Sequence, residues 1–266
     1  MNLTKLPPKL PVVLFIVFIV LTLSSCVPQR KMMFLMDDTG SLPSELQSFE
    51  NLYRKEYRLQ PNDLLFIRVL GLDQQTTDLF SIQPTGMQTQ LYHDEMSVYL
   101  NSFKVDADGS IEFPVIGKIN VKERTLDEVS DLVQNAVNEF IRDATVIVRL
   151  VNFRVSVLGE VARPGRYIVA QNEITIFESI ALAGDMTPWG NRRNVQVVRK
   201  TKDGYDVFGV DLSQRNILES EVFYLMPDDI VYVVPMDSKT YAFTAFPYHI
   251  VLSTITTTLL ILNFFR

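Results

Sequence analysis

The side chains best suited to acid–base or nucleophilic chemistry are few and lie far apart in this 266-residue sequence. The histidines are His93 and His249, and the single cysteine is Cys26. No Gly-x-Ser-x-Gly, Gly-x-x-x-x-Gly-Lys or His-Glu-x-x-His pattern places such groups beside a partner. We therefore predict that the chain is not an enzyme and uses no cofactor or metal.

An Asp-rich stretch ending at Gly109 superficially looks like a calcium-binding loop. If Gly109 were the sixth position, the first and twelfth ligands would be Lys104 and Val115, which supply no carboxylate. Asp108-Gly109 is instead a hairpin turn signal between strand-like segments.

Two charged clusters have both a functional and a structural interpretation. Asp228 and Asp229 are a carboxylate pair suited to proton transfer, but they follow Pro227 and precede a strand-like run, which favours a turn. Trp189 with Asn191–Asn194 contains the aromatic and arginine groups that bind sugars or anions. A solvated loop is the favoured interpretation of this second cluster.

The composition restricts the classes of partner. A net charge of −6 argues against a nucleic-acid partner, because phosphate backbones require a basic surface. With 47% hydrophobic residues, the chain can build one large or two modest cores.

The N-terminus has the pattern of an export signal. Lys5 and Lys9 precede an apolar stretch over 12–23, which is short for a membrane span. The boundary at 23–26 resembles the bacterial lipobox, which predicts a signal peptide over 1–25 and lipidation of Cys26. The alternative is an uncleaved membrane anchor. No aspartate follows Cys26, which favours sorting to the outer membrane.

One turn design occurs twice. An aromatic residue, a leucine, a proline and an aspartate fall at matching offsets in Tyr57–Asp63 and in Phe223–Asp229, and each set leads into a predicted strand.

A helix-start pattern also occurs twice. Thr125 with Glu128, and Thr175 with Glu178, form capping boxes before apolar residues, and Gly184 suits the end of the second helix. The first predicted helix continues to Phe140, and strand-like runs follow over 145–158.

Together these stretches resemble the Wza-type outer-membrane polysaccharide export family. The first part resembles its export domain, and the second its SLBB domain, a ligand-binding β-grasp unit. The motifs that carry the resemblance are Tyr57–Val69, Val105–Ile111, Phe113–Gly117, Val157–Val161, Arg163–Gly165 and Ala181–Gly184.

The sequence departs from the family pattern in three ways. Asp185 stands where a second glycine is common, Asp73–Phe103 looks like an insertion, and one SLBB unit is evident. The resemblance implies an α+β fold with a small β-rich export domain and a β-grasp-like SLBB domain. The implied organisation is a lipidated tether over 26–56, an export domain over 57–150, an SLBB-like domain over 151–240 and a transmembrane helix over 247–265.

The C-terminal run over 247–265 is apolar and would extend roughly 28 Å as a helix, close to a hydrocarbon core of about 30 Å. Ser253, Thr256, Thr257 and Asn263 share one face and are the candidate pore or helix-interface residues. The alternative is a lipid-facing anchor whose hydroxyls bond to their own helix backbone.

The resemblance implies a subunit of a homo-oligomeric outer-membrane conduit that exports capsular or extracellular polysaccharide from the periplasm. Its implied partner is an inner-membrane polysaccharide co-polymerase that regulates chain length. One alternative is a periplasm-facing lipoprotein that binds glycan or scaffolds an envelope complex without forming a pore. Another is an accessory subunit whose tail lies in the inner membrane.

Overall fold

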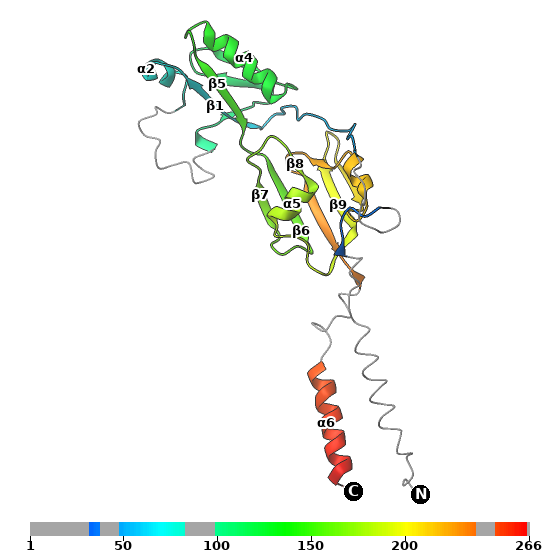
Figure 1. The fold of residues 1–266 in the computed structure, drawn as a ribbon. Helices are drawn as coiled ribbons and strands as arrows, with labels where there is room; N and C mark the ends of the chain where they lie inside the picture. Colours follow the sequence, from blue (N-terminus) through cyan, green and yellow to red (C-terminus); the bar gives the residue numbers. More distant parts are fainter. Residues whose placement is uncertain (1–31, 38–47, 83–98, 238–247, 265–266) are drawn as a thin grey trace.

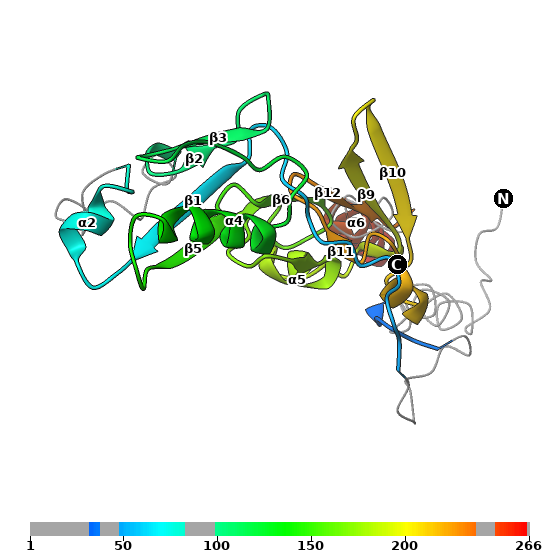
Figure 2. The ribbon, with the colours of Figure 1, turned by 90° about the horizontal axis from the view of Figure 1, so that it is seen from above.

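The computed structural model describes residues 32–37, 48–82, 99–237 and 248–264. These residues form the predicted α+β fold, with two lobes and a separate C-terminal helix (Figure 1). The first lobe has core residues between 59 and 148, and the second between 153 and 233. Figure 2 shows the lobes side by side.

The first lobe is built on a three-stranded antiparallel sheet. Its central strand β1 (Leu64–Leu70) pairs with β2 (Phe103–Lys104) and with β5 (Thr145–Leu150). A hairpin of β3 (Ser110–Phe113) and β4 (Gly117–Asn120) forms a second sheet. The turn predicted at Asp108-Gly109 is present, and its glycine has φ +85°.

Helix α4 (Leu126–Asn138) packs its valines into the core of the first lobe, and the short helix α2 (Gln74–Asp78) lies beyond β1. Val129, Val133 and Val137 fall on one face at four-residue spacing and are fully buried. The predicted apolar run is too long by one member, because Phe140 lies past the end of the helix and is exposed.

The second lobe contains a five-stranded sheet in the order β10-β9-β12-β6-β7. Only the β12–β6 pairing is parallel. The strands are β6 (Arg154–Gly159), β7 (Gly165–Ile168), β9 (Gly190–Lys200), β10 (Tyr205–Val210) and β12 (Ile230–Pro235). Helix α5 (Ile176–Leu182), the 3₁₀ helix η3 (Arg215–Glu219) and a small sheet of β8 (Ile174–Thr175) with β11 (Tyr224–Leu225) complete the lobe.

Gly159, in the Val-Leu-Gly-Glu-Val motif, is required by the close approach of β6 and β12. Its φ is +87°, and an added Cβ would lie 2.1 Å from the carbonyl oxygen of Val233. A side chain is excluded here both by the backbone conformation and by the neighbouring strand.

The two predicted capping boxes are confirmed. In α4 and α5 the threonine side chain accepts from the N3 amide, while the N3 glutamate accepts from the threonine amide. Gly184 follows α5 with φ +78°, as predicted for a helix end. Asp185 adopts φ +72°, so it keeps the left-handed conformation that a second glycine would provide.

The described parts of the predicted tether pack on the second lobe before the chain enters the first. The amides of Leu35 and Met36 donate to the carbonyls of Leu212 and Ser213. Further along, the Asn51 side chain donates to two carbonyls near η3, those of Leu218 and Ser220.

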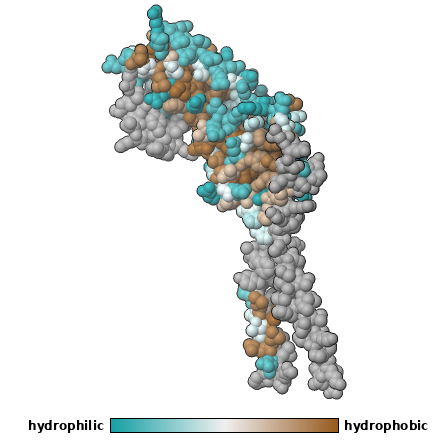
Figure 3. All heavy atoms as spheres, in the orientation of Figure 1, coloured by the Kyte–Doolittle hydropathy of each residue, from teal (hydrophilic) through white to brown (hydrophobic). Residues whose placement is uncertain are grey.

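The C-terminal run forms helix α6 (Tyr248–Phe264) of 17 residues. Figure 3 shows apolar residues along much of it. Among the described residues, however, no helix combines the length and hydropathy needed for a membrane span. The span predicted over 247–265 is therefore not supported.

Candidate binding cleft between the two lobes

The repeated sequence pattern folds into the same turn in both lobes. The amide of Asp63 donates to the carbonyl of Gln60, and the amide of Asp229 donates to that of Met226, each at 3.1 Å. The third residue of the first turn, Asn62, has φ +79°, and the third residue of the second turn, Asp228, has φ +65°. Proline at the second position and a left-handed third residue define a type II turn.

The final aspartate of each turn is buried and closes the turn with its side chain. Asp63 is 6% exposed and Asp229 is fully buried. Each carboxylate accepts from the amide that begins its own turn, Gln60 or Met226, at 2.8 Å. The structure thus supports a structural role for Asp229 over proton transfer.

A second chain segment is hydrogen-bonded to each turn. In the first lobe, the backbone amide of Asn62 donates to the carbonyl of Val105, and the amide of Val105 donates to the backbone carbonyl of Asp63. In the second lobe, the backbone amide of Asp228 donates to the carbonyl of Arg154, and the amide of Ser156 donates to the backbone carbonyl of Asp229. Each turn thus exchanges two backbone hydrogen bonds with a second segment, through Val105 alone in the first lobe and through Arg154 and Ser156 in the second.

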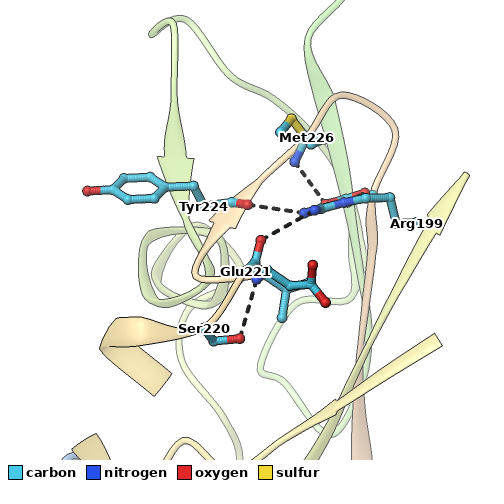
Figure 4. Close-up of polar contacts among 7 residues, drawn as sticks. Arg199, Ser220, Glu221, Tyr224 and Met226 are labelled. Atoms are coloured by element: carbon cyan, nitrogen blue, oxygen red, sulfur yellow. Dashed lines mark hydrogen bonds and ion pairs between the residues drawn. The ribbon is translucent and has the colours of Figure 1, made fainter. Parts of the chain in front are cut away.

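The partner of the buried carboxylate differs. The Tyr57 hydroxyl lies 2.9 and 3.1 Å from the two oxygens of Asp63. Asp229 instead receives hydrogen bonds from Nε and Nη2 of Arg199, the shortest at 2.8 Å. Figure 4 shows the Arg199 guanidinium also directed at the backbone oxygens of Glu221 and Tyr224.

Burial dominates the titration of these groups. It raises the pKa of Asp63, against the hydrogen bonds from Gln60 and Tyr57 that lower it. Burial and the nearby Asp63 carboxylate raise the pKa of Tyr57, so this phenol is protonated and donates. Burial also raises the pKa of Asp229, and the hydrogen bonds and charge of Arg199 oppose that shift.

Both turns line a cleft of about 620 Å³ between the lobes. Residues 55–58 and 60–63, Asn152, the end of β9 with the following turn (199–202), and residues 226–228 form its walls. Its cations are Lys55, Arg58, Arg199, Lys200 and Lys202, and its carboxylates are Glu56, Asp63 and Asp228. A smaller cavity of about 270 Å³ shares the segment 55–57 and Met226-Pro227.

Three of these five cations have no ion-pair partner among the residues that the structure describes. Arg199 is paired with Asp229, and Arg58 lies 3.8 Å from the Glu128 carboxylate. Lys55, Lys200 and Lys202 form no ion pair within the described part of the chain. The Asp228 carboxylate is paired with Arg166 at 2.8 Å. The cleft therefore presents an excess of positive charge.

Asp228, weighed from the sequence as half of a carboxylate pair, lines this cleft, and none of the other described site residues predicted from the sequence does. Cys26 lies outside the described residues. The exposed residues Ser253, Thr256, Thr257 and Asn263 all belong to α6.

Two of the α6 hydroxyls bond to their own helix. Thr256 and Thr257 donate to the carbonyls of Leu252 and Ser253, each at 2.8 Å. This is the bonding expected for the simple-anchor alternative. A pore-facing role for this face of α6 stays a prediction.

The arginine cluster near Trp189 is not the solvated loop that we expected. It lies in β9, where Arg192 occupies an inward position and is 5% exposed. Its guanidinium carbon lies 4.7 Å from the ring centroid of Phe34, in the N-terminal segment. Arg193, the next residue, is exposed, so strand alternation separates the two arginines.

Sequence reasoning missed the lysines of the cleft. Lys200 ends β9, and Lys202 lies within the turn that follows, in which the amide of Thr201 donates to the carbonyl of Gly204. The dipeptide Asp203-Gly204 predicts a turn there. Nothing in the local pattern places Lys55 beside them. Within the described residues, no cluster of three or more metal-binding side chains is present.

The chain is similar to known export proteins along most of its length. Residues 53–151 match a family described as polysaccharide biosynthesis/export protein, and residues 154–211 match the SLBB domain. It is 30% identical over 211 residues to the "EPS I polysaccharide export outer membrane protein EpsA" of Ralstonia solanacearum, covering 76% of this chain and 55% of that protein. The protein of the same name from Ralstonia nicotianae is 30% identical over 107 residues, covering 39% of this chain and 28% of the relative. The chain thus spans about half of the length of the first relative and less of the second.

Proposed function

The chain belongs to the outer-membrane polysaccharide export family, and on that premise we propose that it exports a polysaccharide across the bacterial cell envelope. The observation that carries this proposal is the order of an export-domain match and an SLBB match in one chain, aligned with a relative named as an export protein. The two repeated turns, one from each lobe, both line the cleft.

We further propose the finer arrangement predicted from the sequence. The chain is lipidated on Cys26, faces the periplasm, and forms a homo-oligomeric conduit in the outer membrane for capsular or extracellular polysaccharide. An inner-membrane co-polymerase is its proposed partner. The export domain corresponds to 57–150 and the β-grasp-like SLBB domain to 151–240. In this arrangement, the Ser253, Thr256, Thr257 and Asn263 face of α6 contacts neighbouring subunits or the lumen.

The export role is tested by deleting the gene and measuring polysaccharide on the cell surface and in the periplasm. We expect surface polymer to disappear and to return when the full chain is supplied. Normal surface polymer in the deletion strain would contradict export.

The conduit and the lipid anchor have separate tests. Native mass spectrometry of detergent-extracted protein should give a closed ring, and a monomer or dimer would rule the conduit out. Metabolic acyl labelling should be lost in Cys26→Ser, and unchanged labelling would show that the lipobox interpretation is wrong.

The cleft favours one second candidate, a periplasm-facing lipoprotein that binds glycan without forming a pore. Its volume of about 620 Å³ lies within the range of about 300–1,000 Å³ typical of ligand sites. This candidate predicts a monomeric glycan-binding protein whose deletion leaves surface polysaccharide unchanged.

A further inference from the structure

The walls of the cleft are fixed in position by the two repeated turns. Tyr57 is held by Asp63, and Arg199, which directly precedes Lys200, is held by the fully buried Asp229. The backbones that carry Lys55 and Lys200 are therefore anchored by neighbouring buried hydrogen bonds. A site with fixed walls loses less conformational entropy when it binds a ligand.

The charge of the cleft is opposite in sign to that of the chain. The whole chain carries a net charge of −6, yet the cleft lining has five cations and three carboxylates. Two of the carboxylates, Asp63 and Asp228, already accept from Tyr57 and Arg166. Arg166 neutralises Asp228, but Tyr57 is neutral and leaves the charge of Asp63 in place. Among the described residues, Glu56 and Asp63 therefore oppose Lys55, Lys200 and Lys202, and the net charge at the cleft is still positive.

The neutral residues of the cleft suit hydroxyl groups. Gln60, Asn62, Asn152 and Thr201 supply amide and hydroxyl side chains along the same lining. The side-chain Oδ1 of Asn152 accepts a hydrogen bond from the backbone amide of Leu64, which sets the orientation of this side chain. Lysines with interspersed amides and hydroxyls complement a ligand that carries both anionic and hydroxyl groups.

We propose that this cleft binds a segment of anionic glycan, with Lys55, Lys200 and Lys202 contacting its carboxylate or phosphate groups. The inference rests on the proposed function for the presence of polysaccharide at this protein. A single inorganic anion would fill little of a 620 Å³ cleft. Nucleic acid is disfavoured by the acidic character of the chain as a whole.

The test uses the purified full chain in detergent and a galacturonic acid decamer as the probe. Its methyl ester has the same sugar backbone without the charge, and polyglutamate of equal length has the charge without the sugar. Calorimetry should detect binding of the galacturonate decamer, weakening in high salt because exposed charges are screened. The methyl ester and polyglutamate should each bind at least about tenfold more weakly.

The cleft variant is Lys55→Gln with Lys200→Gln and Lys202→Gln, and we expect it to weaken decamer binding by at least about tenfold. The matched control is Lys104→Gln with Lys118→Gln and Lys122→Gln, which removes three exposed lysines of the first lobe outside the cleft. The control should bind within about twofold of wild type. Melting temperatures of both variants verify folding.

Equal binding of the methyl ester would overturn the role of charge. Equal binding of polyglutamate would show a general acidic-polymer site, such as one for an acidic protein, and would overturn the glycan assignment. Equal losses in the cleft and control variants would remove the cleft as the site. Each of these results leaves export intact when the deletion strain regains surface polymer from the wild-type gene, whereas failure of the deletion test overturns export itself.

Discussion

The Gln60–Asp63 turn of the first lobe and the Met226–Asp229 turn of the second share one backbone design and differ in what holds their carboxylates. In the first lobe the partner is a neutral phenol, Tyr57, six positions from Asp63. In the second it is a guanidinium, Arg199, 30 positions from Asp229. The side-chain partner of Asp63 therefore comes from the same short segment of chain. The side-chain partner of Asp229 comes from strand β9, which lies beside β12 in the sheet.

This difference has an energetic consequence. Removing one partner of a buried ion pair leaves a desolvated charge, which costs more than an unsatisfied neutral hydroxyl. We therefore expect the second turn to be the more sensitive of the two, although their backbones match.

The largest effect is expected for Asp229→Ala. It leaves Arg199 without its carboxylate and should lower the free energy of unfolding by about 3–5 kcal/mol. Urea denaturation followed by the fluorescence of Trp189, the single tryptophan and a residue of the second lobe, measures this loss. The matched control is Asp228→Asn, which removes an ion pair with Arg166 that is more than half exposed on both sides and keeps a side chain that tolerates the positive φ of this position. That control should cost at most about 1 kcal/mol, and equal losses would contradict the ranking.

Asp63→Ala should have a smaller effect, about 1–3 kcal/mol, because the Tyr57 hydroxyl and the Gln60 amide lose an acceptor. Urea denaturation followed by far-UV circular dichroism, to which helix α4 of the first lobe contributes, measures this loss. Asp106→Ala, in another turn of this lobe and exposed, is the control and should be near neutral. A loss at Asp63 as large as that at Asp229 would show that the charge of the partner does not matter.

Tyr57→Phe isolates the phenol and should cost about 1 kcal/mol, since the ring remains and one hydrogen bond is removed. The same denaturation measurement applies. A cost equal to that of Asp63→Ala would mean that the Gln60 amide contributes nothing to the turn.

The smallest effect concerns pH. Burial raises the pKa of Asp63 above the ordinary value of 3.8 for this side chain, so the folded chain binds this proton more tightly than the unfolded chain. The resulting stability is present below pH 3.8 and is lost as the pH rises through the folded pKa. As the pH rises from 3.8 through the folded pKa, the free energy of unfolding of wild type should therefore fall relative to that of Asp63→Asn. A difference that is constant with pH would contradict the direction of the shift.

Much of the local structure was predictable because it is set by contacts within a few residues. The capping threonines each accept from an amide three positions away, and the turn prolines and Gly184 set the backbone conformation at their own positions. The left-handed Asp185 was identified as a departure, and its conformation follows from the tolerance of aspartate for positive φ. The sequence pattern did not indicate that Arg192 turns inward, because that depends on Phe34 packing over it from the N-terminal segment.

The sequence by itself determined the strands, caps and repeated turns, since short-range hydrogen bonds and side-chain alternation require no knowledge of the rest of the chain. The tertiary structure alone decided which carboxylate meets a phenol and which meets an arginine. It also decided that Lys55 lies in one cleft with Lys200 and Lys202. The physical reason is that a cleft is the surface two lobes leave uncovered, and its charge depends on residues brought together only by packing.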